Sequence, residues 1–210
     1  MKRSVILICA ILSIVVMSCK KSSDNTIPVA VADYYQLKVG NYWIYQGYKI
    51  DSNGIAIPQS YFDSAHIEKD TIIRGYTYYK FWESPLALHG GHQLHSYVRD
   101  SSGFLINNLG HRSCSASDFI DTLVFDTANL PYFIAYGKMT GKDSAVTIPA
   151  GTFQSITLRL KVIPLRPEDS LPIRYSYDVF GKNVGKIKSH SFFYYGGEQL
   201  EARLVRFKVQ

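Results

Sequence analysis

Three histidines lie close together in the middle of the chain, at His89, His92 and His95, in the segment His-Gly-Gly-His-Gln-Leu-His. Imidazole nitrogens bind zinc and copper, and the two glycines could let the segment fold back so that the three rings converge. On an extended strand, however, His92 and His95 would point to opposite faces, and no metalloprotease motif accompanies them. We therefore predict a solvated histidine-rich turn and keep a metal site at these residues as the alternative.

Other catalytic patterns are absent from the sequence. It contains no Gly-x-Ser-x-Gly elbow, no phosphate-binding glycine loop, no Cys-x-x-Cys pair and no dinucleotide fingerprint. The acidic residues nominate no catalytic pair, because the carboxylate separation that a glycosidase needs is a property of the folded chain. We expect a protein that is not an enzyme and that uses no cofactor.

The first nineteen residues have the organisation of an export signal. Lys2 and Arg3 precede the apolar run 5–16, which ends just before Cys19. That run is about twelve residues long, whereas a membrane-spanning helix needs roughly 20. The segment resembles a bacterial lipoprotein signal, which implies removal of residues 1–18, attachment of lipid to the Cys19 thiol, and a membrane anchor made of acyl chains.

Removal of the signal changes the charge and the cysteine content of the chain. The full sequence has 23 Lys and Arg residues against 17 Asp and Glu residues, a net charge of +6, and the signal contains two of the basic residues. The remaining basic residues are scattered, so no nucleic-acid partner is expected. Cys114 is the one thiol left for the folded domain, so no disulfide is expected and the role of Cys114 is open.

The rest of the chain divides into a tether and one domain. Residues 19–32 are polar and contain a proline, which predicts a lipidated flexible tether. Residues 33–210 are predicted to form one β-rich globular domain, because runs of Tyr, Phe, Val, Ile and Thr alternate with turn-forming residues. The predicted strands cover 41–50, 61–73, 76–83, 93–99, 103–108, 121–127, 132–139, 144–149, 152–163, 172–180, 183–193 and 198–209.

Two of these strands have informative side-chain patterns. In 152–163, apolar and polar residues alternate, which predicts one face in the core and one in water. In 76–83, both faces carry aromatic rings, so this strand either lies between two layers or lines a hydrophobic concavity. The predicted core positions of 152–163 are Ile156, Leu158, Leu160 and Val162, and the predicted water-facing positions are Ser155, Thr157, Arg159 and Lys161.

Three segments resemble patterns found in Bacteroidetes envelope lipoproteins. Residues 37–45 are similar to an LxVGNxWxY opening, and residues 146–153 followed by 184–188 are similar to a VxxPAGTF…VGxVK pattern. The resemblance implies a mostly β fold with an antiparallel, strongly curved sheet, half-barrel or sandwich-like, as in periplasmic lipoprotein carriers. It implies no activity and no catalytic residues.

Asp followed by a hydroxyl residue and then a small or aliphatic residue recurs six times, where composition predicts roughly 0.5 by chance. The triplet resembles the acceptor of the O-glycosylation system that Bacteroidetes apply to exported proteins, in which the middle hydroxyl carries the glycan. The structural alternative is that Asp-Ser or Asp-Thr often opens a strand. The predicted acceptors are Ser64, Thr71, Thr122, Thr127, Ser144 and Ser170.

These observations predict a lipid-anchored, non-catalytic protein of the cell envelope that binds an apolar ligand, a glycan or an envelope protein partner. We expect it at the outer membrane, with the periplasmic side favoured, because Cys19 is not followed by the dense acidic run that resembles a surface-export signal. The alternatives are a metal-dependent hydrolase that uses the histidine-rich loop, and a structural accessory subunit of an outer-membrane assembly.

Overall fold

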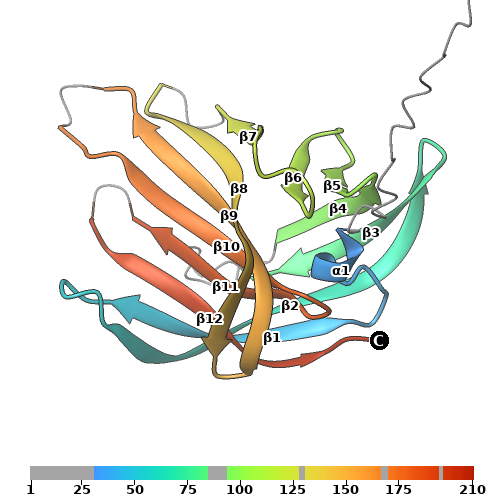
Figure 1. The fold of residues 1–210 in the computed structure, drawn as a ribbon, viewed down its shortest axis with the longest axis horizontal. Coiled ribbons are helices and arrows are strands. Elements are labelled where there is room, and N and C mark those ends of the chain that lie inside the picture. The colour runs from blue at the N-terminus through green and yellow to red at the C-terminus, as the bar shows by residue number, and fades with distance from the viewer. Residues whose placement is uncertain (1–30, 85–93, 128–130, 167–169, 194–195) are drawn as a thin grey trace, which may run out of the picture.

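A computed structural model of the chain describes residues 31–84, 94–127, 131–166, 170–193 and 196–210. These residues form one antiparallel sheet of twelve strands and a short helix, α1 (Ala32–Tyr35) (Figure 1). The prediction of a mostly β, strongly curved antiparallel sheet in a single domain is confirmed. Within the ranges given above, no helix is long and apolar enough to cross a membrane.

The strands follow one another up and down along the curved sheet. Their order is β6-β5-β4-β3-β2-β1-β12-β11-β10-β9-β8-β7, so the first and last strands of the chain pair in the middle and β6 and β7 form the two edges. These edges approach each other, so the sheet is nearly closed. The bounds are β1 (Tyr42–Ile50), β2 (Ala56–Ile73), β3 (Tyr76–Glu83), β4 (Leu94–Ser101), β5 (Phe104–Asn107), β6 (Arg112–Ser115), β7 (Thr122–Asp126), β8 (Phe133–Ile148), β9 (Gly151–Pro164), β10 (Arg174–Gly181), β11 (Gly185–Phe192) and β12 (Gln199–Lys208).

The predicted elements differ from the structure at several places, and β2 begins at Ala56 where a start at residue 61 was predicted. The two strands predicted over 132–139 and 144–149 are one bent strand, β8. Its pairing with β9 breaks off at Thr140 and resumes at Ser144, because Gly141 and Asp143 between them adopt positive φ angles of 60° and 54°. β6 and α1 were not predicted. Val31, which directly precedes α1, is fully buried.

β9 has the predicted core face only in part. Ile156 and Leu158 are buried and Arg159 is exposed, as predicted. Leu160 and Val162 are only half-buried. Ser155, predicted to face water, is fully buried.

The burial of Ser155 results from a second layer of packing at this end of the hairpin formed by β8 and β9. Its hydroxyl donates a hydrogen bond to the backbone oxygen of Ser144 (2.8 Å). Nearby, the Phe153 ring packs against Phe207 of β12, with ring centres 6.1 Å apart. The strand is therefore covered on both faces here, which alternation along the sequence does not reveal.

The aromatic strand β3 is packed on its inner face. Phe81 contacts Trp43 of β1 and Tyr35 of α1, with ring centres 5.9 and 6.2 Å apart. On the opposite face, the Arg99 guanidinium lies 4.3 Å from the centre of the Tyr76 ring, a cation–π contact. The described contacts support a packed layer on the inner face at Phe81, whereas Tyr76 on the opposite face is exposed.

Two of the segments that resemble envelope lipoproteins lie against each other. The Trp43 indole donates a hydrogen bond to the backbone oxygen of Val184 (2.6 Å), and the Tyr45 hydroxyl donates one to that of Lys186 (2.9 Å). Gly185 lies between these acceptors with a φ of +107°, and a Cβ there would be 2.9–3.1 Å from the Trp43 ring. Only glycine therefore fits this position without strain.

We predict that Gly185→Ala lowers the free energy of unfolding by about 3 kcal/mol, because it combines an unfavourable positive φ with a clash against Trp43. The matched control is Gly75→Ala, which also has a positive φ (+81°) but would meet no atom within 4 Å. We expect a loss of about 1 kcal/mol for the control. Chemical denaturation measures both, and equal losses would contradict the close contact between Gly185 and Trp43.

Candidate functional site

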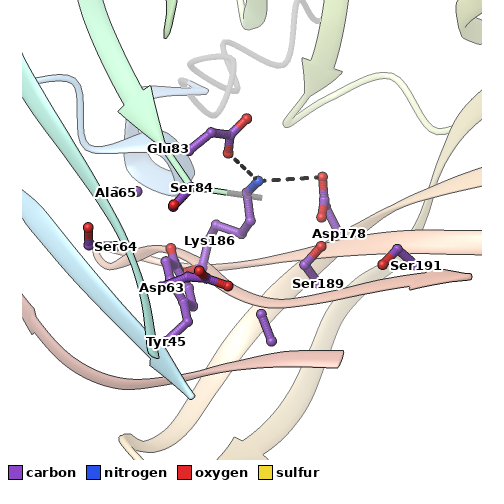
Figure 2. A pocket seen from close by; sticks show the side chains of 11 residues that line it. Tyr45, Asp63, Ser64, Ala65, Glu83, Ser84, Asp178, Lys186, Ser189 and Ser191 are labelled. Atoms are coloured by element: carbon purple, nitrogen blue, oxygen red, sulfur yellow. Dashed lines mark hydrogen bonds and ion pairs between the residues drawn. The ribbon is translucent and has the colours of Figure 1, made fainter. Parts of the chain in front are cut away.

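A cavity of about 230 Å³ opens on the concave face of the sheet, between β1–β3 on one side and β10–β12 on the other (Figure 2). Its lining includes four charged side chains and four serines, alongside apolar surface. The lining residues are Tyr45, Asp63, Ser64, Ala65, Glu83, Ser84, Asp178, Lys186, Ser189, Ser191 and Ala202.

Lys186 of β11 connects the two walls of this cavity. Its ammonium nitrogen is 3.0 Å from a carboxylate oxygen of Glu83 and 3.8 Å from one of Asp178 (Figure 2). Asp178 lies on the neighbouring strand β10, but Glu83 lies on β3, four positions away in the order of the sheet. Only the curvature of the sheet brings Glu83 to Lys186, so this ion pair spans the interior.

A bulge in β11 aims Lys186 into the cavity. On a regular strand, Lys186 and Lys188 would share a face. The pairing with β10 shifts at this point: Phe180 lies opposite Lys186, and Val179 lies opposite Lys188, which leaves Ile187 as an extra residue. Lys186 therefore reaches the cavity, whereas Lys188 contacts a different acid.

That acid is Glu201, the centre of a separate ion cluster. Its carboxylate is buried and accepts hydrogen bonds from Tyr177 (2.5 Å) and Arg203 (2.6 Å), and it lies 2.6 Å from the Lys188 ammonium. Burial alone would raise the pKa of Glu201, but these three partners outweigh it and lower the pKa. Glu201 is thus held as a carboxylate by structural partners outside the cavity lining.

The environment of Lys186 keeps its amine protonated. Burial alone would lower its pKa, but the carboxylates of Asp178 and Glu83 outweigh burial and raise the pKa well above its ordinary value of 10.5. An ammonium can donate hydrogen bonds, but it is neither a nucleophile nor a general base. The central group of the cavity is therefore suited to binding.

Of the three predicted metal ligands, the structure describes only His95. His89 and His92 lie outside the described residues. His95 is exposed on β4, with its ring centre 5.0 Å from that of Trp82. In the described part of the chain, no group of three or more His, Cys, Asp or Glu side chains is placed to hold a metal ion. The metal site stays a prediction.

The six predicted glycan acceptors differ in exposure. Ser64 and Thr71 are half-buried, and Ser64 lies in the cavity wall. The remaining four, which are Thr122, Thr127, Ser144 and Ser170, are exposed. Cys19, the predicted lipidation site, lies outside the described residues. Modification of these side chains therefore stays a prediction.

Cys114 is a buried core residue. Its sulfur lies 3.9 Å from that of Met139. Burial raises the pKa of its thiol to about 12, so the reactive thiolate is scarce at neutral pH. The contacts of Cys114 support a packing role.

Apart from Ser64, which was predicted as a glycan acceptor, the residues that line the cavity were not nominated from the sequence. Lys186 falls within the 184–188 segment that resembles envelope lipoproteins, and that was the one signal pointing to it. Glu83 and Asp178 are more than ninety residues apart in the chain, and no local pattern singles them out.

The chain matches no protein-family model and no curated protein. It is similar to two solved structures, each with a TM-score of 0.47. One is described as an exported protein with a YmcC-like fold from Bacteroides fragilis (13% identity, covering 83% of this chain and 98% of that one). The other is described as a lipoprotein from Parabacteroides distasonis (14% identity, covering 84% and 99%). At this level of similarity, neither relationship defines a function.

We predict that Lys186→Gln destabilises the fold by about 2 kcal/mol, because it leaves two partly buried carboxylates without their cation. The matched control is Lys49→Gln, which breaks an exposed pair with Glu198 (2.7 Å) and is expected to cost at most about 1 kcal/mol.

The destabilisation caused by Lys186→Gln should become smaller at high pH. Because the pKa of Lys186 is raised in the folded state, its contribution is fully present at neutral pH and is lost only as the pH rises through that raised pKa. Denaturation at neutral pH and well above pH 10.5 measures this, and the difference between the wild type and Lys186→Gln should shrink at the higher pH. If Lys186→Gln lowers the free energy of unfolding at neutral pH no more than Lys49→Gln does, the ion pairs of Lys186 with Glu83 and Asp178 do not stabilise the fold.

Proposed function

We propose that this chain is a lipid-anchored, non-catalytic protein of the bacterial cell envelope that binds a small polar ligand in the concave cavity. The observation that carries this proposal is the fixed ammonium of Lys186 in a cavity lined by serines and carboxylates. Ligand sites commonly combine a preformed concavity with a few oriented polar groups.

The lining favours a polar ligand over the apolar ligand considered from the sequence. An apolar molecule would remove water from Lys186, Asp178 and Glu83 without replacing their hydrogen bonds, which is costly. The hydroxyls of Ser189 and Ser191 can each donate and accept hydrogen bonds, as sugar hydroxyls require. Of the predicted partners, a glycan fits best.

The size of the cavity limits the ligand. At about 230 Å³ it is smaller than the roughly 300–1,000 Å³ typical of sites for drug-sized molecules. It suits one sugar unit or a molecule of similar size. A longer glycan would bind through one residue and extend into solvent.

The chemistry of the cavity also supports a binding role over a catalytic one. Lys186 is protonated, and its charge is shared by the two carboxylates that it contacts. A metal-dependent hydrolase would need the histidine-rich loop, whose His89 and His92 lie outside the described residues. No contact among the described residues favours that alternative.

The location follows from the N-terminal pattern. Lys2, Arg3 and the apolar run before Cys19 support export and lipid attachment, and acyl chains on Cys19 would hold the domain at a membrane. The absence of a dense acidic run after Cys19 supports the periplasmic face of the outer membrane.

We predict that Cys19→Ala abolishes lipid attachment, because thioether formation requires the thiol. In cells fed a labelled fatty acid, the variant should carry no label and should run as the unprocessed precursor, whereas Cys114→Ala should be labelled like the wild type. Normal labelling of Cys19→Ala would refute the anchor.

We predict that the domain from residue 31 to 210 binds glucose with millimolar affinity, and that the amide signals shifted in NMR titration lie around the cavity, at Ser189, Ser191 and Ala202. Ser191→Trp should abolish these shifts, because the indole would fill the space. Ser170→Trp, at an exposed position outside the lining, should preserve them. Shifts that map elsewhere, or that survive in Ser191→Trp, would refute the cavity as the binding site.

A further inference from the structure

The charges of the cavity lining do not balance. Asp63, Glu83 and Asp178 carry negative charge, and Lys186 is the one basic residue among the lining side chains. In a concave site with low-dielectric walls, such an excess produces a negative potential that attracts cations and repels anions.

The two contacts of Lys186 are not equivalent. Glu83 lies within hydrogen-bond distance of its ammonium, at 3.0 Å. Asp178 lies at 3.8 Å, which is an electrostatic contact too long for a hydrogen bond. The Asp178 carboxylate, which also lines the cavity, therefore keeps the capacity to accept a hydrogen bond from a ligand.

Other groups near Asp178 suit a hydroxyl. Ser189 lies directly opposite Asp178 in the pairing of β10 and β11, so both side chains share a face, and Ser191 follows two residues later on the same face. Figure 2 shows Asp178, Ser189 and Ser191 side by side along one wall. An ammonium and an adjacent hydroxyl on one ligand could engage this wall together.

We propose that the ligand of this cavity is a small primary amine that also carries hydroxyl groups, with its ammonium bound by Asp178 and its hydroxyls bound by Ser189 and Ser191. This inference rests on the proposed function and specifies the ligand class. An amino sugar and an ethanolamine head group share this chemistry.

The direct test compares sugars of the same ring that differ in charge. We expect glucosamine to bind the wild-type domain about fivefold tighter than glucose, and glucuronic acid to bind more weakly than glucose. Equal affinities for all three, or a preference for glucuronic acid, would overturn the inference while leaving the proposed function intact. No binding of any of the three would overturn the proposed function itself.

A fourth titration, with ethanolamine, distinguishes an amino sugar from an ethanolamine head group as the ligand. Tighter binding of glucosamine identifies the amino sugar, and equal or tighter binding of ethanolamine identifies the head group; either result supports an amine ligand. Weaker binding of both amines than of glucose would contradict it.

A variant tests whether Asp178 is the residue that gives the preference for glucosamine over glucose. Asp178→Asn should abolish the preference for glucosamine over glucose, because it removes the carboxylate that accepts from the ammonium. Asp121→Asn makes the same change at an exposed residue outside the lining and should keep the preference within about twofold of the wild type. A preference that survives Asp178→Asn would overturn the assignment. Because the sugar comparison uses the wild-type domain, it stands whether or not this variant folds.

Discussion

The contact of Lys186 with Glu83 is the interaction on which the site depends. It joins β11 to β3, which are separated by three strands in the sheet (Figure 1), and so the ion pair is made across the concave interior. A flatter sheet would separate these groups and leave a buried ammonium with one acid. The ion pair therefore requires the curvature of the sheet. The packing of Tyr35 from α1 between Phe81 of β3 and Phe180 of β10 supports the same curvature with apolar contacts.

The position of Lys186 is fixed by its immediate neighbours in the chain. The bulge at Ile187 turns Lys186 inward, and Gly185 lets the backbone pass close to the Trp43 ring. Tyr45 then holds the backbone oxygen of Lys186. These contacts give a structural reason for the residue types in segments 37–45 and 184–188: they lock β1 to the start of β11 and place a lysine over the cavity. Lys186 and its partners are thus built on strands, which are more rigid than loops.

The sequence was sufficient to predict the fold class and most strands, because alternation and turn residues are local signals. It was insufficient for the site, for two physical reasons. Glu83 and Asp178 meet Lys186 only through long-range curvature. By their spacing along the strand, Lys186 and Lys188 should lie on the same face of the sheet. Only the one-residue bulge between them turns Lys186 into the cavity and Lys188 to the opposite face. Ser155 was assigned to the wrong environment for a similar reason, since a second packed layer covers a face that alternation assigns to water.

The most direct test of the central claim is the protonation state of Lys186, followed by nitrogen-15 NMR of its side-chain amine as the pH is raised. The signal is assigned by its loss in Lys186→Arg. If Lys186 is held between Glu83 and Asp178, the amine will remain predominantly protonated at pH 10.5, the ordinary pKa of lysine, and will titrate only above it. Half-titration at or below pH 10.5 would show that the two carboxylates do not hold this ammonium across the cavity, and the account of the site would fail.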